Sequence, residues 1–417
     1  MILFYFPDSV DVINPGYCFD VEEHDRKRRR IVSEAYPHEA YEQPPYDGML
    51  VSKATVKTRY SMAQRQRLMR QGIRKFLRLN TPKLEHIKVI GDCGAFTYRD
   101  EVEPPYSVDE VIDFYDSLGF DMGISLDHVI LGFEDEDDAK YELFPDSNKL
   151  EALNEFKRRQ ETTLRLAEEF YTKSKQRKVC FKPLGVAQGW SPSSYAHAVE
   201  RLQEIGYDYI ALGGMVALKT EEIESCLRKI KSVRNKTTKF HLLGISRIDE
   251  LREFEKYGVA SADSTAPLVQ AFKSNRDNFQ LGDDSYIALR VQQVGENNKV
   301  KKLVLSGAIS QDLARKMELD CLRLLKAYDN GDATAEEVVN ALCQLEALIT
   351  QKAKIKNRDL YMRTLKERPW KDCGCPICEE LGIHVAIFRG AERNRRRGFH
   401  NLYNYYSILK GKRNTTK

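Results

Sequence analysis

The alternation of strand-like and helix-like segments from about residue 87 constrains the fold more than any other feature of the sequence. Short apolar or β-branched runs end in turns rich in Gly, Asp or Ser, and a stretch with helical periodicity follows each run. This pattern predicts a parallel sheet, and the number of units favours a closed (β/α)8 barrel of the TIM type over an open sheet. We expect strands at residues 87–92, 121–127, 178–188, 209–214, 240–246 and 259–264.

The segments outside this pattern differ in character. Residues 1–80 are irregular, although residues 65–78 have the apolar spacing of a basic amphipathic helix. Residues 280–306 alternate, which predicts either a hairpin or a late barrel strand, and residues 307–368 have helical periodicity. We therefore expect an N-terminal extension over residues 1–80 and a barrel with helical insertions over residues 81–368.

Length and composition are those of a globular protein. The 417 residues suffice for one large barrel plus appendages, and 42% of them are hydrophobic. No stretch approaches the length of a membrane span, and no basic residue precedes the short apolar run at the N-terminus, as a secretory signal requires. We expect a cytoplasmic protein that does not contact membranes.

Positive charge is concentrated near the C-terminus. Residues 351–417 hold 17 Lys and Arg against 6 Asp and Glu, a net charge of +11, whereas the whole chain carries only +4. A basic module joined to a mildly acidic body indicates a polyanionic partner, because phosphate binding needs clustered cations. A solvated basic tail explains the charge alone equally well.

A cluster of cysteines predicts a metal site. Three of the nine cysteines lie close together, at Cys373, Cys375 and Cys378. The spacing C-x-C-x2-C, with Gly and Pro between the thiolates, suits one tetrahedral ion, and His400 is the expected fourth ligand. His384 competes less well because its surroundings in the sequence are apolar. We predict a structural zinc site within a basic module over residues 369–417, in a reducing compartment.

Three aspartates each end a predicted strand: Asp92, Asp127 and Asp263. In a β/α barrel the side chains at strand ends point into one mouth, where the active site forms. Carboxylates that converge there acquire different pKa values and different roles. Each aspartate alone is better explained as a helix cap or a turn residue. Together with glycines beside the same strand ends, the three predict a pocket for a flat ligand.

These residues lie in motifs that resemble those of the tRNA-guanine transglycosylases. GDCGAF at 91–96 is similar to the family's D-S-G-G-F/Y element, and SLD at 125–127 is similar to its F-D element. VAQG at 186–189 resembles V-Q-G, and LGG at 212–214 resembles the G-G of the guanine-binding loop.

The later motifs continue the resemblance. GVASAD at 258–263 is similar to G-V-D-M-F-D, which carries the family's nucleophilic aspartate. The cysteine cluster and HNLY at 400–403 resemble the family's zinc ligands and its H-N-L ending. Each motif is short, but all six occur in the family's order between about residues 87 and 410.

The resemblance implies a ping-pong exchange of guanine for a 7-deazaguanine within a polynucleotide. Asp263 would attack the anomeric carbon and leave a covalent glycosyl-enzyme, and Asp92 would act as general acid and base. Phe96 is also explained as an ordinary core aromatic residue. The substrate-binding residues that the resemblance implies are Phe96, Asp127, Gln188, Gly189, Gly213, Gly214, Leu243 and Gly244.

The sequence departs from the tRNA enzymes where those enzymes read tRNA. Their C-V-x-P-T-R element after the nucleophile is replaced by STAPL at 264–268, which has no arginine. Residues 1–80 do not resemble the family's usual opening. The pattern resembles the DNA-modifying branch of the superfamily, which inserts a 7-deazaguanine such as 7-cyano-7-deazaguanine into DNA. A divergent tRNA-guanine transglycosylase acting on tRNA is the alternative.

DNA as a substrate must present its guanine outside the duplex, which costs roughly a few kcal/mol. The basic segments 65–78 and 389–417 are candidates for phosphate contacts. Aromatic residues within 395–406 suit base stacking, but packing of the zinc module on the barrel explains them slightly better. A non-catalytic, zinc-bearing nucleic-acid-binding protein is an alternative that retention of Asp92 and Asp263 disfavours. The sequence leaves open a partner, such as an ATPase, that opens the duplex.

Overall fold

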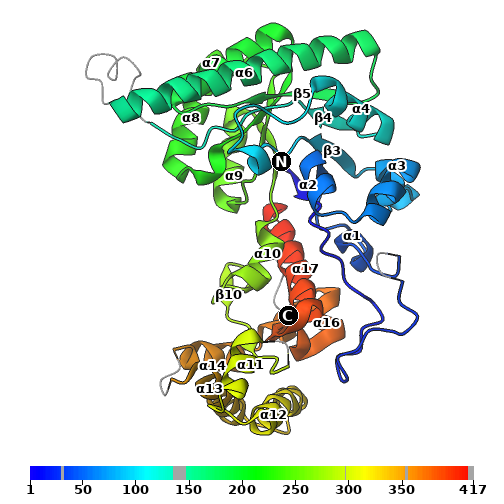
Figure 1. Cartoon of the computed structure of the whole chain (residues 1–417), viewed down its shortest axis with the longest axis vertical. Coiled ribbons are helices and arrows are strands. Elements are labelled where there is room, and N and C mark those ends of the chain that lie inside the picture. The colour runs from blue at the N-terminus through cyan, green and yellow to red at the C-terminus, as the bar shows by residue number, and fades with distance from the viewer. Residues whose placement is uncertain (30–31, 135–146, 296, 353–355, 412–417) are drawn as a thin grey trace. The chain divides into compact units, whose positions relative to one another are not determined.

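The computed structural model describes residues 1–29, 32–134, 147–295, 297–352 and 356–411, and these form two compact units. The first, here called the barrel unit, comprises residues 1–10 and 46–265. The second unit comprises residues 11–45 and 266–417. Each unit is therefore discontinuous in sequence, because the chain leaves the barrel unit after its first ten residues and later returns to it (Figure 1).

The barrel unit is a closed, eight-stranded parallel barrel in which the strands follow their order in the chain. The last strand pairs with the first, and Tyr5 lies opposite Asp263 at the seam. This confirms the predicted α/β fold class with its (β/α)8 barrel. The strands are β1 Leu3–Pro7, β2 Gly48–Ser52, β3 Lys88–Asp92, β4 Met122–Ile124, β5 Lys182–Ala187, β6 Tyr209–Leu212, β7 Lys239–Leu242 and β8 Val259–Asp263.

Helices connect the strands and cover the outside of the barrel. Figure 1 shows the long helix α6 beside α7, with α8 following along the same sheet. The helices of this unit are α2 Lys53–Thr58, α3 Met62–Phe76, α4 Val108–Leu118, α6 Ser147–Arg177, α7 Pro192–Ile205, α8 Thr220–Val233 and α9 Ile248–Phe254. Four short 3-10 turns complete it at Pro82–Leu84, Ala95–Tyr98, Met215–Ala217 and Glu255–Tyr257.

The expected domain boundaries need correction. Strands β1 and β2 lie within residues 1–80, which the sequence analysis assigned to an extension outside the barrel. The last barrel strand ends at Asp263, so the helical residues up to 368 belong to the second unit. The reason is physical: residues 11–45 fold into the second unit instead of forming a crossover helix, so no strand–helix alternation marks the first two strands.

Local sequence fixes α4 against the sheet. Its first turn is a capping box in which the side chains and backbones of Ser107 and Glu110 bond reciprocally. Tyr115 on its inner face lies over Gly91 and Gly123, and a Cβ atom at either glycine would lie 2.3 or 2.4 Å from the ring. Only glycine leaves room for the ring at this distance. The Tyr115 ring thus packs α4 directly on β3 and β4, the strands that lead to Asp92 and Asp127.

The barrel interior is packed with apolar and aromatic side chains, as expected for a small closed barrel. Its core cluster consists of Tyr5, Leu50, Ile90, Ile124, Leu184, Val186, Tyr209 and Ala211. Because this cluster fills the barrel, ligands can be bound only at its ends. Polar residues that a ligand could reach, among them Asp92 and Asp263, stand at the carboxyl ends of the strands.

The second unit contains most of the helices predicted for residues 307–368. Its elements are α1 Pro37–Ala40, α10 Ala266–Lys273, β9 Phe279–Leu281, β10 Asp284–Tyr286, β11 Leu289–Arg290, α11 Asn298–Leu305, α12 Gln311–Asn330, α13 Ala335–Thr350, α14 Arg358–Glu367, α15 Pro369–Asp372, α16 Pro376–Leu381, the 3-10 turn Gly382–Ala386, β12 Ile387–Phe388 and α17 Gly390–Leu409. Of the two predictions for residues 280–306, the hairpin is right only for the start of the segment, where β9 and β10 pair antiparallel. In place of the late barrel strand the chain forms α11, which Asn297 caps.

No helix in the described part of the chain combines the length and the apolar character needed to cross a bilayer.

Candidate active site and metal centre

The carboxyl ends of the barrel strands surround a cavity of about 340 Å³. A volume of this size is at the lower end of the range for small-molecule sites. Nine of the predicted site residues line it: Asp92, Phe96, Asp127, Gln188, Gly213, Gly214, Leu243, Gly244 and Asp263. The sequence motifs therefore converge on one place in the fold.

Three carboxylates meet in this cavity and affect one another. Asp92 and Asp263 are the last residues of β3 and β8, and Asp127 follows β4. Burial, followed by repulsion from the Asp127 and Asp263 carboxylates, raises the pKa of Asp92 to about 7. Burial also raises the pKa of Asp127. Asp92 is thus suited to exchange a proton near neutral pH, as a general acid and base must.

Asp127 is held by two buried donors. The Gln188 amide nitrogen donates to its Oδ2 at 2.6 Å, and the Cys93 thiol donates to its Oδ1 at 3.0 Å. Tyr98 in turn donates its hydroxyl to the Cys93 sulfur at 3.0 Å. Gln188 is fixed at its other end, because its Oε1 accepts the Ile130 N–H at 3.2 Å. The orientation of the Gln188 amide therefore follows from its partners.

Two glycines bring the backbone after β6 close to this network. A Cβ atom at Gly213 would lie 2.2 Å from the Gln188 amide nitrogen, and one at Gly214 would lie 2.5 Å from the Ile130 carbonyl oxygen. Gly214 also has φ of +77°, in the left-handed region that favours glycine. Backbone groups can therefore reach a flat ligand here, where a side chain would fill the space.

The mouth of the cavity is apolar. Phe96 is 58% exposed, so it is not a core residue, and the guanidinium of Arg99 lies 4.7 Å from the centre of its ring. Several further apolar residues also line the cavity, and sequence reasoning missed them because an apolar side chain in a strand or turn carries no signal for ligand contact. These are Leu50, Ala95, Val129, Leu131 and Val216.

Gly189 does not line the cavity with the other predicted residues. A Cβ atom there would lie 2.7 Å from the ring of Tyr195, so its role is a close packing contact beneath α7. The Tyr195 hydroxyl donates to the Gly213 carbonyl at 2.7 Å. Gly189 therefore supports the glycine loop indirectly and is not placed to touch a ligand.

Asp263 accepts hydrogen bonds from two donors, of which the sequence predicted Gly244 as a site residue but not His241. The Gly244 N–H donates to its Oδ1 at 3.1 Å, and the His241 Nε2 lies 3.1 Å from the same oxygen. His241 sits in β7 and is completely buried. No motif identified it, because its contact with Asp263 depends on the pairing of two strands.

In the second unit the four predicted metal ligands come together. Cys373, Cys375, Cys378 and His400 are all buried, and their ligand atoms lie within 4.8 Å of one another. The three sulfur atoms are 3.3 to 3.5 Å from His400 Nδ1. The His400 Nε2–H donates to the Gln280 carbonyl at 2.6 Å, which turns Nδ1 toward the thiolates. The set can hold a metal ion.

His384 does not join this cluster. Its ring stacks on Phe19, with centroids 5.3 Å apart, and burial lowers its pKa to about 4. The apolar sequence around His384 argued against a role as a metal ligand, and in the structure its ring is indeed packed away from the cysteines.

Comparison with known proteins gives the family. No protein-family model matches the chain. A DNA-guanine transglycosylase of Salmonella montevideo is 44% identical over 414 residues, which cover 97% of this chain and 96% of that protein.

The chain belongs to the DNA-guanine transglycosylase family. This confirms the resemblance to the tRNA-guanine transglycosylase superfamily and its DNA-modifying branch. Membership of the family makes the protein an enzyme of the glycosyltransferase class.

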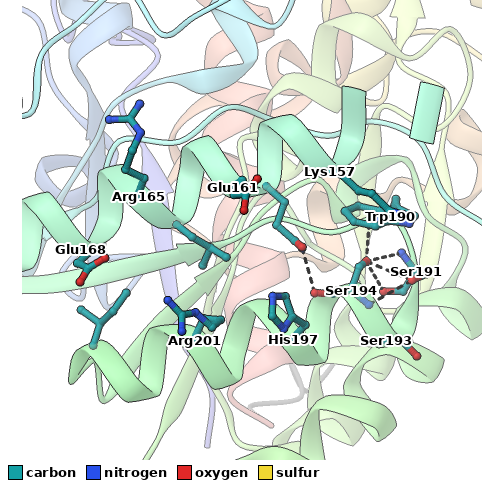
Figure 2. A pocket seen from close by; sticks show the side chains of 13 residues that line it. Lys157, Glu161, Arg165, Glu168, Trp190, Ser191, Ser193, Ser194, His197 and Arg201 are labelled. Carbon is teal, nitrogen blue, oxygen red and sulfur yellow. Dashed lines mark hydrogen bonds between the residues drawn. The ribbon is translucent and has the colours of Figure 1, made fainter. Parts of the chain in front are cut away.

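A second cavity in this family member, of about 780 Å³, lies between α6 and α7 (Figure 2). Arg165 and Glu168 project from α6, and His197 projects from α7, so its walls carry both signs of charge. None of the three active-site carboxylates lines it. Gln160, one of its lining residues, donates to the Gln188 carbonyl at 2.7 Å, which links this region to the cavity at the strand ends.

Most of the Lys and Arg side chains in the described part of residues 389–417 are buried, so these side chains do not form a phosphate-binding surface. Four arginines of this segment are buried in the second unit: Arg389, Arg393, Arg396 and Arg397. Glu22 accepts from the first two, and the others donate to carbonyls such as those of Asn14 and Ala271. The ring of Tyr403 stacks on Tyr41 at 4.8 Å. Residues 412–417 lie outside the described part of the chain.

Proposed function

We propose that this enzyme exchanges guanine in DNA for a 7-deazaguanine base, such as 7-cyano-7-deazaguanine, through a covalent aspartyl-glycosyl intermediate. One observation carries the proposal. Asp92 and Asp263 line the same cavity, and the pKa of Asp92 is raised to about 7 in part by the charge of Asp263. The family relationship supports guanine and DNA as substrates.

The first half-reaction removes guanine. The Asp263 carboxylate attacks the anomeric carbon, a carbon–oxygen bond forms, and the bond from that carbon to guanine breaks. The electron pair of the broken bond moves to guanine, which takes a proton from the carboxylic acid of Asp92. The product is a glycosyl ester of Asp263 and an ionised Asp92.

The second half-reaction attaches the new base. The ring nitrogen of the 7-deazaguanine attacks the anomeric carbon, and its proton passes to the Asp92 carboxylate. The ester bond breaks, and its electron pair returns to the Asp263 carboxylate. Both side chains regain their starting protonation states, as a two-carboxylate retaining mechanism requires.

Base recognition falls to the remaining lining residues. Asp127 and Gln188 present polar groups to a purine edge, and the backbones of Gly213 and Gly214 approach closely enough to bind its carbonyl oxygen. The ring would lie between Phe96 and Leu243, in keeping with the apolar walls of most base-binding pockets.

Phosphate binding is proposed for α2 and α3. Residues 53–78 contain nine Lys and Arg and no Asp or Glu. Lys57, Arg59 and Arg70 are exposed. α2 begins directly after Ser52, which lies opposite Asp92 in the β2–β3 pair, so this surface starts at the active-site mouth. Cations at this place can offset the cost of extruding a nucleotide.

We propose zinc for the Cys3His cluster. Three thiolates and one imidazole are a usual tetrahedral set for this ion, and the Gln280 carbonyl supplies the contact that orients the histidine. When bound, zinc would contribute free energy of folding to the second unit and take no part in the base exchange. The expected cytoplasmic location stays a prediction.

Nucleoside analysis of DNA and tRNA from cells that express the protein tests the proposal. We expect a 7-deazaguanine in DNA, none in tRNA, and none in either from cells with Asp263→Asn. Cells also supply any duplex-opening ATPase partner. Modified tRNA with unmodified DNA would establish the tRNA alternative. Protein that binds DNA yet modifies neither polymer would be the non-catalytic alternative.

A further inference from the structure

A chain of hydrogen-bonded side chains lies behind Asp263 inside the barrel. The Tyr209 hydroxyl bonds with the Ser261 hydroxyl, and the Ser261 oxygen is 2.6 Å from His241 Nδ1. The other ring nitrogen of His241, Nε2, is 3.1 Å from Asp263 Oδ1. The three strands β6, β7 and β8 each supply part of this chain. His241 and Ser261 are completely buried.

For a neutral imidazole at His241, the chemistry of the groups fixes the direction of each bond. An ionised carboxylate only accepts, so His241 Nε2 must donate its proton to Asp263. A neutral imidazole then accepts at Nδ1, and the Ser261 hydroxyl is the donor to it. The Ser261 oxygen in turn accepts from Tyr209. Each group therefore donates one proton along the chain, and the chain ends at the carboxylate.

The two oxygens of Asp263 are not equivalent. The His241 Nε2–H and the Gly244 N–H both donate to Oδ1, each at 3.1 Å. Among the described residues, these are the hydrogen bonds that hold the Asp263 carboxylate. Oδ2 is thus the oxygen left to meet an electrophile in the cavity that Asp263 lines.

The ring of His241 is held from a further side by β1. Tyr5 meets it edge to face, with centroids 5.8 Å apart and an interplanar angle of 79°. Tyr5 itself lies opposite Asp263 in the β1–β8 pair. Packing as well as hydrogen bonding therefore fixes the ring plane of His241, and with it the direction of the bond to Oδ1.

This chain is not a nucleophilic Ser–His–Asp triad. Ser261 has no exposed surface and accepts from Tyr209, so its hydroxyl cannot meet a substrate. The group that reaches the cavity is Asp263, at the opposite end. In the motif G-V-D-M-F-D, moreover, the position of Ser261 is a methionine, which has no hydroxyl. The chain is thus a feature of this sequence and not of the motif.

We propose that His241 is a positioning residue that controls both half-reactions through Oδ1 of Asp263. This proposal rests on the proposed function. In the first half-reaction, the held Oδ1 directs Oδ2 at the anomeric carbon. In the second, the bond from Oδ2 to that carbon breaks and its electron pair returns to the carboxylate. Donors to Oδ1 stabilise that carboxylate more than the ester, because hydrogen bonds to charged acceptors are about twice as strong as neutral ones.

The test compares His241→Leu with His241→Gln. Leucine removes the donor, whereas the glutamine amide retains a donor for Asp263 and an acceptor for Ser261. Enzyme is mixed with labelled DNA, and the adduct is measured by denaturing electrophoresis, before and after addition of 7-deazaguanine base. We expect adduct decay to slow about tenfold to hundredfold in His241→Leu, the range for a lost charged hydrogen bond, so that adduct accumulates. His241→Gln should restore most of the decay rate.

A purely structural role predicts a different result. It would slow adduct formation and decay equally, and it would leave His241→Gln no better than His241→Leu. Either outcome overturns the proposal. Should His241→Leu fail to fold, Ser261→Ala is the milder variant; it frees the tautomer of His241 and must slow decay more than formation. If wild-type enzyme forms adduct and these variants do not alter its decay, only this inference fails. If wild-type enzyme forms no adduct, the proposed function fails as well.

Discussion

Replacing Asp92 with asparagine should stabilise the fold and at the same time abolish proton exchange. The pKa of Asp92 in the folded protein is about 7, against an ordinary value of 3.8. The folded state therefore binds a proton that the unfolded state has lost between these two pH values, and stability falls as pH rises through that window. The difference amounts to at most about 4 kcal/mol above pH 7. The asparagine side chain carries no charge at any of these pH values, so Asp92→Asn avoids this loss.

Two assays follow from this reasoning. Urea unfolding at pH 5 and pH 8 should show a clearly larger gain of Asp92→Asn at pH 8, because at pH 5 only part of the window between 3.8 and about 7 has been crossed. Asp329→Asn is the matched control, because the pKa of Asp329 is lowered and the expected change in stability has the opposite sign. Asp329 accepts from Trp370 and from the Ile383 N–H, and such bonds lower its pKa, so its removal should destabilise the protein at pH 8. Equal unfolding midpoints for wild type and Asp92→Asn at pH 8 would refute the claim that the pKa of Asp92 is raised to about 7.

The same pKa predicts opposite pH profiles for the two half-reactions. Departure of guanine needs protonated Asp92, so single-turnover adduct formation in wild type should fall about tenfold between pH 6 and pH 8. Attack by the incoming base needs ionised Asp92, so adduct decay should rise with pH, and over a lower interval, because the ester has removed the Asp263 charge that helps to raise this pKa. Profiles that run in parallel would assign the proton transfers to another group.

The remaining predictions concern the nucleophile, the metal, the base pocket and the phosphate surface. Asp263→Asn should form no adduct on denaturing gels, whereas adduct from Asp263→Asn but not from Asp92→Asn would exchange the two roles. Cys375→Ser should lose the metal in elemental analysis and lower the melting temperature, whereas His384→Ala should keep the metal. Gly213→Ala should raise the KM for the base and also lower the melting temperature, since its Cβ would lie 2.2 Å from the Gln188 amide nitrogen that Asp127 holds. Arg70→Glu should raise the KM for DNA and flatten its salt dependence, and Lys229→Glu on α8 should not.

Much of the active site was predictable because catalytic groups in this fold stand at strand ends. Six strands are marked by an apolar run, a Gly- or Asp-containing turn and a helix, and Asp92 and Asp263 each close one of them. The metal ligands were predictable for a similar reason, since three of them lie within six residues and need no knowledge of the tertiary fold.

The parts of the fold and the site that the sequence did not predict depend on contacts between residues far apart in the chain, and such contacts leave no periodic signal. β1 is apolar, but the segment after it forms no crossover helix, so nothing marks it as a barrel strand. His241 lies inside a strand like its apolar neighbours, and only pairing with β8 brings it to Asp263. The arginines of α17 illustrate the same limit: composition counts their charge but not their partner Glu22, which is 367 residues away from Arg389.

That separation has a consequence for biosynthesis. At about 5 to 20 residues per second, a ribosome needs roughly 20 to 70 seconds to pass from Glu22 to Arg389. During that time residues 11–45, whose side chains such as Ile13 and Tyr41 end up buried, have emerged without the helix that covers them. Seven of the eight barrel strands, β2 to β8, are synthesised in the interval. Nascent chains should therefore carry an uncovered apolar segment until the last helix is made, which makes chaperones that hold such segments a determinant of yield.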